Sequence, residues 1–352
     1  MPAYLHAIGT AVPAHDVHTA FIDWATPRVE PRARALFARM AARAGIHHRW
    51  SVLPGVDGAS AVEAGGFYAD AIPSTGARMA VYAQEAPTLA LTAIAALAEQ
   101  VELGAITHLV VASCTGFVAP GIDQIVAQRL GLAASVERLL IGFMGCYAAI
   151  VALRSARHIV RSDPQARVLV VTVELSTLHL QAESAVEPLL AMLQFGDGAA
   201  AALVTGDAGG IELGAPFAAT LPDSAALIRW TITDAGFAMH LDGAVPARIG
   251  AALNDPAFVD TVTAGADPDD LFWAVHAGGR SILDAVQSAL ALPPDALADA
   301  RAVLADNGNM SSATLMFVLA RMLRDRPAVQ QGVALAFGPG LAAEGLALRI
   351  AA

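Results

Sequence analysis

Three polar residues of this chain each follow an apolar run and lie beside glycines: Cys146, His276 and Asn309. A thiol can act as a nucleophile, an imidazole can carry a proton, and an amide can hydrogen-bond to an oxyanion. Together these are the parts needed for acyl transfer through a thioester. Each residue alone has a more ordinary explanation, because buried cysteines, core histidines and turn asparagines are common. Spacing alone does not show that the three meet.

The cysteine lies in LLIGFMGCYAAIVAL, residues 139–153, where an apolar run changes from strand-like to helix-like. LLIGF is short enough for a buried strand, and the Ala-rich segment after it carries arginines on one polar face. We therefore expect the thiol of Cys146 at the N-terminus of a helix. The helix dipole and the free N–H groups at that position favour a thiolate.

The histidine and the asparagine occupy similar positions in the second part of the chain. Residues 271–279, LFWAVHAGG, predict a strand that leads His276 into a Gly-Gly turn, and residues 306–323 predict a polar turn before an apolar helix. If His276 lies near Cys146, the pair exists partly as imidazolium and thiolate, ready to attack an acyl thioester. With His276, Asn309 can then hold the oxygen of a thioester enolate.

The composition limits the classes of function. With 56% hydrophobic and 15% charged residues, the 352-residue chain is typical of a well-buried globular enzyme. A net charge of −11 without a basic block argues against nucleic acid or an anionic membrane as the main partner. No apolar run reaches the roughly 20 residues of a membrane span, and the N-terminus lacks the basic start of a signal peptide.

The two cysteines, Cys114 and Cys146, are too few for a disulfide scaffold and have no zinc-binding spacing. We therefore expect no metal site and a reduced, cytoplasmic setting.

The order of predicted elements indicates an α/β protein made of two similar halves. Strand-like and helix-like segments alternate, which predicts a mainly parallel sheet covered on both faces. We expect a loop over residues 53–75, a long helix over residues 86–102, and a helix capped by Asp123. We place the boundary near residue 207, which gives an N-terminal half of residues 1–207 with the cysteine and a C-terminal half of residues 208–352 with His276 and Asn309.

Seven segments, in this order and separation, resemble the type III polyketide synthases, the chalcone-synthase-like branch of the thiolase-fold condensing enzymes. This resemblance covers nearly the whole chain. It implies a thiolase-like five-layer αβαβα fold, a homodimer, acyl-CoA and malonyl-CoA as substrates, and no cofactor beyond these thioesters. The segments are CTGFVAPGID (114–123), MGCYAA (144–149), VLVVTVELS (168–176), FGDGAAAALV (195–204), HAGGRSILD (276–284), GNMSSA (308–313) and FGPGL (337–341).

The resemblance also implies roles for individual residues. It makes Cys146, His276 and Asn309 the catalytic residues, and Phe195 a gate between the coenzyme A tunnel and the cavity. Met239 stands where the family has a second gate phenylalanine, and the remaining expected cavity residues are Cys114, Thr115, Ser176 and Ser311. Arg39 and Arg43 are expected to bind coenzyme A phosphates. Leu36 replaces a lysine that binds coenzyme A in the family, and Arg280 can compensate for it.

The implied reaction is an iterative decarboxylative condensation. A starter acyl group is held on Cys146, malonyl-CoA loses carbon dioxide, the resulting enolate attacks the thioester, and cyclisation gives a pyrone, resorcinol or related ring. Three alternatives stay open at this point: a ketoacyl synthase that uses an acyl carrier protein, a Cys-His thioesterase, and a non-catalytic dimer partner that binds acyl-CoA. The sequence does not identify the starter, the number of extensions or the mode of ring closure.

Overall fold

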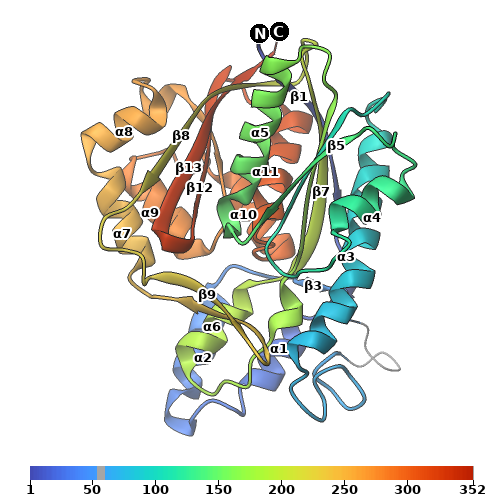
Figure 1. Ribbon diagram of the computed structural model, residues 1–352. Helices are drawn as coiled ribbons and strands as arrows, with labels where there is room; N and C mark the ends of the chain where they lie inside the picture. Colours follow the sequence, from blue (N-terminus) through green and yellow to red (C-terminus); the bar gives the residue numbers. More distant parts are fainter. Residues whose placement is uncertain (54–59, 352) are drawn as a thin grey trace.

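Nine strands of the molecule join in one mixed sheet (Figure 1). The computed structural model describes residues 1–53 and 60–351. Across the nine-stranded sheet the order is β5-β4-β6-β7-β1-β8-β13-β12-β11. Only two residue pairs, at Tyr4 and Leu5, join β1 to β8, so the sheet consists of two parts connected by a narrow seam. The strands are β1 (Tyr4–Ala11), β4 (His108–Ser113), β5 (Glu137–Gly142), β6 (Val168–Leu175), β7 (Asp197–Thr205), β8 (Ile211–Thr220), β11 (Phe272–Val275), β12 (Gln331–Gly338) and β13 (Ala342–Ile350).

The helices form three layers around and between the two parts of the sheet. Figure 1 shows α5 and α11 between the parts, α3 and α4 outside one of them, and α7 and α9 outside the other. Helix α10 packs against α9, α11 and β11. This confirms the predicted αβαβα order. The helices are α1 (His18–Ala25), α2 (Arg34–Arg43), α3 (Thr75–Ala98), α4 (Ile122–Arg129), α5 (Ala148–Ser162), α6 (Val186–Gln194), α7 (Val245–Leu253), α8 (Pro256–Thr263), α9 (Arg280–Ala289), α10 (Ala298–Asn307) and α11 (Ser312–Asp325).

The first turns of the two central helices are buried because they meet a sheet on both sides. Helix α5 contacts β4 and β6 on one side and β12 and β13 on the other, and α11 contacts β1 and β7 as well as β11. In α5 every residue from Ala148 to Leu153 is buried, and in α11 every residue from Ser312 to Met316 is buried. A helix buried on all sides loses the polar stripe of a surface helix. Both central helices begin at the same end of the molecule, and that end holds the predicted site residues.

The prediction of a mainly parallel sheet is wrong. The pairs β4–β5, β4–β6 and β11–β12 are parallel, and the other five neighbours in the sheet are antiparallel. Between β6 and β7 the chain leaves the sheet through residues 176–196, which include α6, and returns from the same end. Because α6 lies beyond the end of the strands and does not cross the sheet face, β7 runs antiparallel to β6 (Figure 1).

Two local predictions also need correction. Helix α3 begins at Thr75, well before residue 86: the Ser74 side chain accepts the Ala77 N–H at 3.2 Å and caps the helix, and Pro87 lies inside it. Gly121, not Asp123, is the N-cap of α4, and the Asp123 carboxylate is 2.5 Å from Arg138 Nη1. The predicted loop over residues 53–75 lies partly outside the described residues. From residue 60 to 74 the chain forms neither an α-helix nor a strand.

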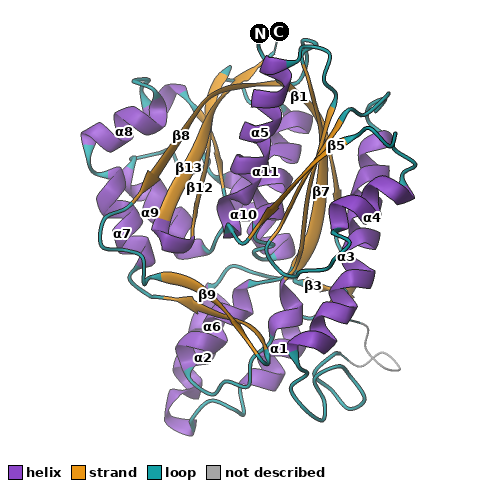
Figure 2. Ribbon diagram, viewed as in Figure 1, coloured by secondary structure: helices purple, strands orange, loops and turns teal. Residues whose placement is uncertain are grey.

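Beyond the end of the large sheet lies a smaller region that closes over the site (Figure 2). It contains α1, α2 and α6, the short pair β2 (His15–Asp16) and β3 (Trp50–Ser51), and a hairpin of β9 (Ile228–Thr233) and β10 (Gly236–Leu241). Across the described parts of the chain, every helix is too short or too polar to cross a membrane.

Candidate active site

The three predicted catalytic residues meet in one cavity at the end of the sheet. Cys146 lies in the short turn before α5, His276 follows β11, and Asn309 lies between α10 and α11. All three line one cavity, and Asn309 Nδ2 is 3.9 Å from Cys146 Sγ. The structure thus brings a nucleophile, an imidazole and an amide from both parts of the chain to one place.

A tight turn delivers Cys146 to the start of α5. Gly145 has φ +74°, and a Cβ at this position would lie 2.5 Å from Pro339 Cδ, so only glycine fits. As predicted, the thiol lies at the beginning of a helix. Burial raises the pKa of Cys146 to about 11, and hydrogen bonding from Ser311 and Asn309 opposes this shift. A thiolate standing alone in this cavity is therefore unfavourable, in contrast to the expectation from the helix dipole.

His276 has a buried ring whose two nitrogens have no hydrogen-bond partner within the described part of the chain. Burial lowers the pKa of His276 to about 3 because the charged imidazolium is desolvated. The ring is therefore neutral in the free protein. Buried polar atoms without partners are rare in folded proteins, and both nitrogens are available to a ligand or to water in the cavity.

Asn309 is held in a fixed orientation. Its Oδ1 accepts the Ser311 N–H at 2.8 Å, and its Nδ2 donates to the Gly278 carbonyl at 3.2 Å. The main chain of Asn309 pairs with the segment after α6: its N–H donates to the Gln194 carbonyl at 2.7 Å, and its carbonyl accepts the Gly196 N–H at 3.0 Å. Nδ2 also donates weakly to Cys146 Sγ at 3.9 Å, so the same group can reach an oxygen bound beside that sulfur.

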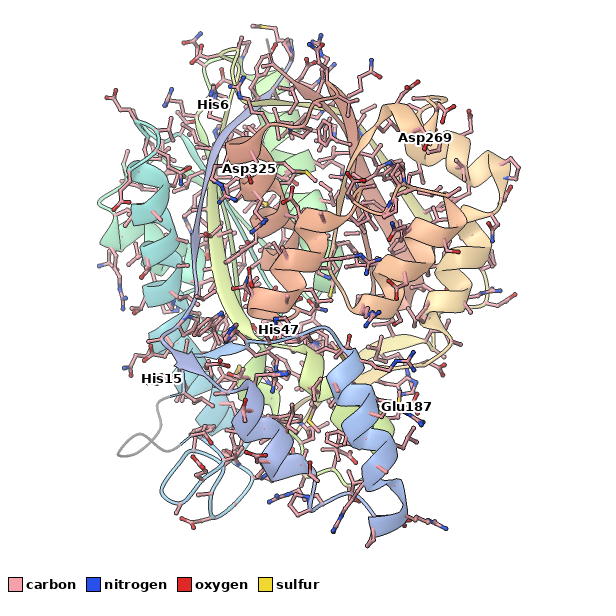
Figure 3. All side chains as sticks on the ribbon, turned by 180° about the vertical axis from the view of Figure 1, so that it is seen from behind. His6, His15, His47, Glu187, Asp269 and Asp325 are labelled. Atoms are coloured by element: carbon pink, nitrogen blue, oxygen red, sulfur yellow. The ribbon has the colours of Figure 1, made fainter. Side chains whose placement is uncertain are left out.

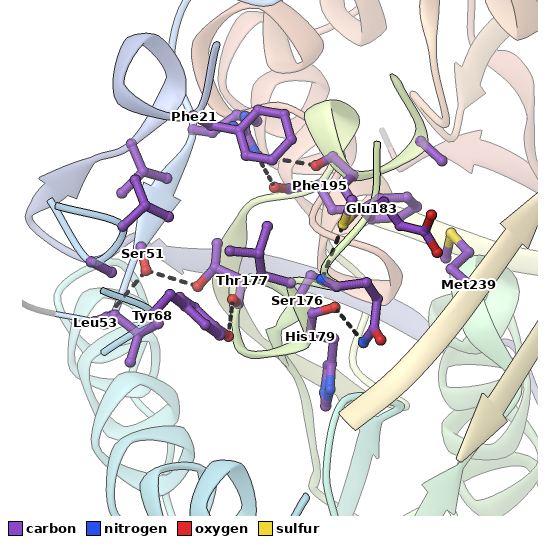
Figure 4. A pocket seen from close by; sticks show the side chains of 18 of the residues that line it. Phe21, Ser51, Leu53, Tyr68, Ser176, Thr177, His179, Glu183, Phe195 and Met239 are labelled. Carbon is purple, nitrogen blue, oxygen red and sulfur yellow. Dashed lines mark hydrogen bonds between the residues drawn. The ribbon is translucent and has the colours of Figure 1, made fainter. Parts of the chain in front are cut away.

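A second cavity lies next to the catalytic one (Figure 4). Most of its wall is apolar. Phe195, Trp230 and Met239 line both cavities and form the wall between them. Ser176 lines the second cavity and Ser311 lines the catalytic cavity. Four of the expected cavity residues therefore lie where substrate can reach them.

Trp230 is a cavity residue that the sequence reasoning missed. It lies on β9 directly opposite Met239 on β10. A signal was present, because IRWTITDAGFAMHL alternates around a short turn containing Asp234 and Gly236, and such a pattern predicts a hairpin. Counting outward from that turn would have paired Trp230 with Met239.

Cys114 and Thr115 line neither cavity. Our expectation that both lie in a cavity wall is therefore wrong. Cys114 is buried, and its Sγ accepts the Gly145 N–H at 3.0 Å. Thr115 Oγ1 donates to Glu174 at 2.9 Å and accepts the Leu175 N–H at 2.8 Å. Burial raises the pKa of Cys114 well above its ordinary value. Cys114 therefore supports the turn that holds Cys146, and Thr115 fixes Glu174 and the end of β6.

The buried carboxyl of Glu174 is a further residue that the sequence did not reveal. It accepts the Cys114 N–H at 2.9 Å and also bonds to Ser312 at the start of α11. Burial raises its pKa to about 7, since these hydrogen bonds only partly offset the desolvation of the charge. Glu174 thereby links β6 to the main chain at Cys114 and to the start of α11.

The three arginines expected to bind coenzyme A lie on two adjacent helices. Arg39 and Arg43 are exposed on α2, which Figure 3 shows at the outer surface near His47. Arg280 begins α9, and its Nη1 donates to the Arg43 carbonyl at 3.3 Å. Gly278 and Ile282, on either side of Arg280 in the chain, both line the catalytic cavity. The cations therefore stand close to that cavity.

A five-layer fold with a cysteine, a histidine and an asparagine in one buried cavity defines a condensing acyltransferase of the thiolase-like class. The family model of chalcone and stilbene synthases, N-terminal domain, matches residues 1–208, and the corresponding C-terminal domain model matches residues 212–351. This chain belongs to the chalcone and stilbene synthase family, the type III polyketide synthases.

Individual relatives agree with this assignment. Bisdemethoxycurcumin synthase of Oryza sativa subsp. japonica is 36% identical over 301 residues, which cover 78% of this chain and 74% of that protein. Type III polyketide synthase C of Arabidopsis thaliana is 34% identical over 260 residues, which cover 69% of this chain and 67% of that protein. The crystal structure of PKS-I from the brown alga Ectocarpus siliculosus has a TM-score of 0.89 at 28% identity, with 99% of this chain and 98% of that chain covered. The type III polyketide synthase domain of Steely1 from Dictyostelium has a TM-score of 0.91 at 25% identity, with both chains covered completely.

Proposed function

We propose that this type III polyketide synthase loads an acyl group from an acyl-CoA onto Cys146 and extends it with units from malonyl-CoA. The observation that carries the proposal is the shared cavity in which Cys146, His276 and Asn309 meet beside a second, larger cavity. The first supplies the chemistry and the second supplies room for a chain that grows by two carbons in each round.

Loading begins with a proton transfer from Cys146 to His276. Burial opposes a thiolate or an imidazolium alone, but the transfer creates both charges together, and their attraction in a poorly solvated cavity offsets the desolvation. The thiolate attacks the thioester carbonyl of the starter, and the bond from that carbon to the coenzyme A sulfur breaks. The departing thiolate takes the proton from His276, which leaves the acyl group on Cys146 and the imidazole neutral.

Extension uses His276 and Asn309 as donors to an oxyanion. When malonyl-CoA loses carbon dioxide, the electron pair of the broken carbon–carbon bond moves into the thioester and places negative charge on its oxygen. A neutral imidazole N–H and the Asn309 amide, which points toward Cys146 Sγ, stabilise that oxygen. The enolate carbon then attacks the acyl carbonyl on Cys146, the bond from that carbonyl carbon to Sγ breaks, and the extended chain leaves on coenzyme A. Because the substrate's own carboxylate supplies the electron pair, we propose no cofactor beyond the thioesters.

Phe195 and Met239 separate the two compartments in this scheme. Phe195 acts as a gate beside the catalytic cavity, and Met239 and Trp230 complete the wall. The extended chain returns to Cys146 for another round and occupies the second cavity beside Ser176 until it cyclises to a pyrone, resorcinol or related ring. Ser311 holds Asn309 in place through its main-chain N–H.

Arg39, Arg43 and Arg280 bind the phosphates of coenzyme A in this proposal. Within the described residues, neither Arg39 nor Arg43 has a carboxylate within 4.0 Å. Guanidinium groups suit phosphate because they offer several donors in one plane. Their position beside Gly278 and Ile282 leaves the pantetheine arm a short path to Cys146.

We further propose a homodimer formed through the edge strand β5. Among the strands that the structure describes, β5 pairs only with β4, and its Leu139 and Leu140 are 42% and 45% exposed. Phe117, 50% exposed, lies beside the same strand. An exposed apolar edge strand favours pairing with a second chain. We expect sedimentation velocity to give a dimer for the wild type and a monomer for Leu140→Glu; a monomeric wild type would contradict the proposal.

We place the enzyme in the cytoplasm, where thiols stay reduced. The proposed nucleophile works only as a free thiol, and both cysteines of the chain are unpaired. Detection of the native protein in a cell fraction enriched in secreted or membrane material, and not in the cytoplasmic fraction, would contradict this placement.

The proposed function is tested by turnover with a panel of acyl-CoA esters and isotopically labelled malonyl-CoA. We expect products whose masses exceed the starter by whole extension units, together with release of carbon dioxide. Replacement of malonyl-CoA by malonyl-ACP separates the ketoacyl synthase alternative, which would prefer the carrier protein. Release of unextended acid without carbon dioxide would identify a thioesterase instead.

A further inference from the structure

Arg49 is a buried cation that the mechanism above does not use. It is 3% exposed and directly precedes β3. Its Nη1 donates to the carbonyls of Phe195 at 2.8 Å and Met192 at 3.2 Å, and its Nε donates to His18 Nδ1 at 3.1 Å. Its guanidinium also lies over the Phe21 ring at 4.8 Å. Among the described residues no carboxylate lies within 4.0 Å of its side chain.

These contacts show what the cation does. Burying a guanidinium without a close counter-ion costs free energy, and the hydrogen bonds that the guanidinium donates must offset this cost. Arg49 donates hydrogen bonds to carbonyls at the C-terminus of α6 and so fixes the main chain at Phe195. The helix dipole favours a cation at this end of a helix. Burial lowers the pKa of Arg49 to about 10, which leaves the group charged at neutral pH.

The stem of Arg49 also packs between the gate and the asparagine segment. A Cβ at Gly308, which has φ +68°, would lie 2.9 Å from Arg49 Cγ, and one at Gly196 would lie 3.5 Å from Arg49 Cβ. The main chain around Phe195 pairs in turn with Asn309. Arg49 therefore touches the two short segments that carry the gate and the oxyanion donor.

The gate depends more on Arg49 than the asparagine does. The Asn309 side chain keeps its own hydrogen bonds to Gly278 and Ser311. The Phe195 ring has no polar anchor, so its position in the wall follows from its main chain and from packing. Loss of Arg49 is therefore expected to move the ring while the oxyanion donor stays in place.

We propose that Arg49 is a positioning residue that holds the Phe195 gate and so keeps decarboxylation of the extender coupled to carbon–carbon bond formation. This inference rests on the proposed function. When the ring is displaced, the enolate formed from malonyl-CoA takes a proton from water and leaves as acetyl-CoA. A correctly placed ring excludes water, and the enolate carbon then bonds to the acyl group on Cys146.

The test compares Arg49→Lys and Arg49→Met with the wild type, measuring acetyl-CoA and extended product from the same reaction. Lysine keeps the charge but cannot make the three hydrogen bonds at once. We expect the ratio of acetyl-CoA to product to rise about tenfold in Arg49→Lys and further in Arg49→Met, with total carbon dioxide release within about threefold of wild type. The partial recovery by lysine distinguishes positioning from mere space filling.

Arg78→Lys is the matched control. Arg78 is also fully buried, donates to the carbonyls of Pro73, Leu178 and Leu180, and lies over a tyrosine ring, but it lines neither cavity. We expect it to lower the melting temperature as much as Arg49→Lys while the product ratio stays at the wild-type value. An unchanged ratio in Arg49→Lys, or an equal rise in Arg78→Lys, would overturn the inference. A wild type that makes no extended product would instead overturn the proposed function.

Discussion

Replacing Cys146 by alanine should abolish polyketide formation while malonyl-CoA decarboxylation continues. The acyl group then has no nucleophile to hold it, but His276 and Asn309 still face the oxygen of the extender enolate. We expect extended product to fall by at least about 10⁴-fold and decarboxylation to stay within about tenfold of the wild-type rate. Product masses and labelled carbon dioxide, measured in one reaction, check both values.

Intact-mass measurement supplies the control for this result. After incubation with a starter acyl-CoA and no extender, the wild type should gain one acyl group and Cys146→Ala should gain none. Cys114→Ala should keep the adduct, because Cys114 lies behind the cysteine turn and not in the cavity. Full product from Cys146→Ala, or loss of the adduct only in Cys114→Ala, would show that the nucleophile is assigned to the wrong thiol.

Replacing His276 by glutamine should slow alkylation of Cys146 at neutral pH by at least about a hundredfold. Burial, partly offset by hydrogen bonds from Ser311 and Asn309, raises the pKa of this thiol to about 11, and without His276 no group in the described structure is placed to accept its proton. The alkylation rate of the variant should then rise about tenfold per pH unit from pH 6 to 9, since the thiolate fraction grows toward the pKa. In the wild type, proton transfer to His276 should give a rate that varies little over this range.

Iodoacetamide labelling followed by peptide mass spectrometry measures these rates at Cys146. The same series in a Cys114→Ala background removes the second thiol from the comparison. Identical pH profiles for His276→Gln and the parent protein would show that the imidazole does not take up the proton.

The positions of the three proposed catalytic residues could be predicted from the sequence because each lies where an element begins or ends. Cys146 before a helix and His276 after a strand are local features, and apolar runs with glycines mark both positions. The layer order followed from the resemblance. Strand direction did not follow, because it depends on whether the segment between β6 and β7 crosses the sheet or extends beyond its end, and residues 176–196 carry no local signal for that choice.

The cavity wall was harder to predict for a different physical reason. Whether a side chain faces a cavity depends on which neighbour fills the space beside it. Cys114 turned inward because its sulfur accepts a main-chain N–H from Gly145, 31 positions away in the chain. Trp230 entered the wall through a hairpin whose register sets it against Met239. Long-range contacts of this kind are not visible in the residues themselves, even where the local elements are correct.

The shared wall of Phe195, Trp230 and Met239 has a consequence for the evolution of specificity. A residue that lines both compartments cannot be altered for one of them alone, so under the proposed function we expect a substitution there to change starter choice and final chain length together. Starter choice or chain length could be changed separately only through residues that line a single compartment, such as Ser176 in the second cavity and Ile282 in the catalytic cavity. Product diversification in this enzyme would therefore proceed through paired changes, in which a substitution at the wall is followed by a correcting one away from it.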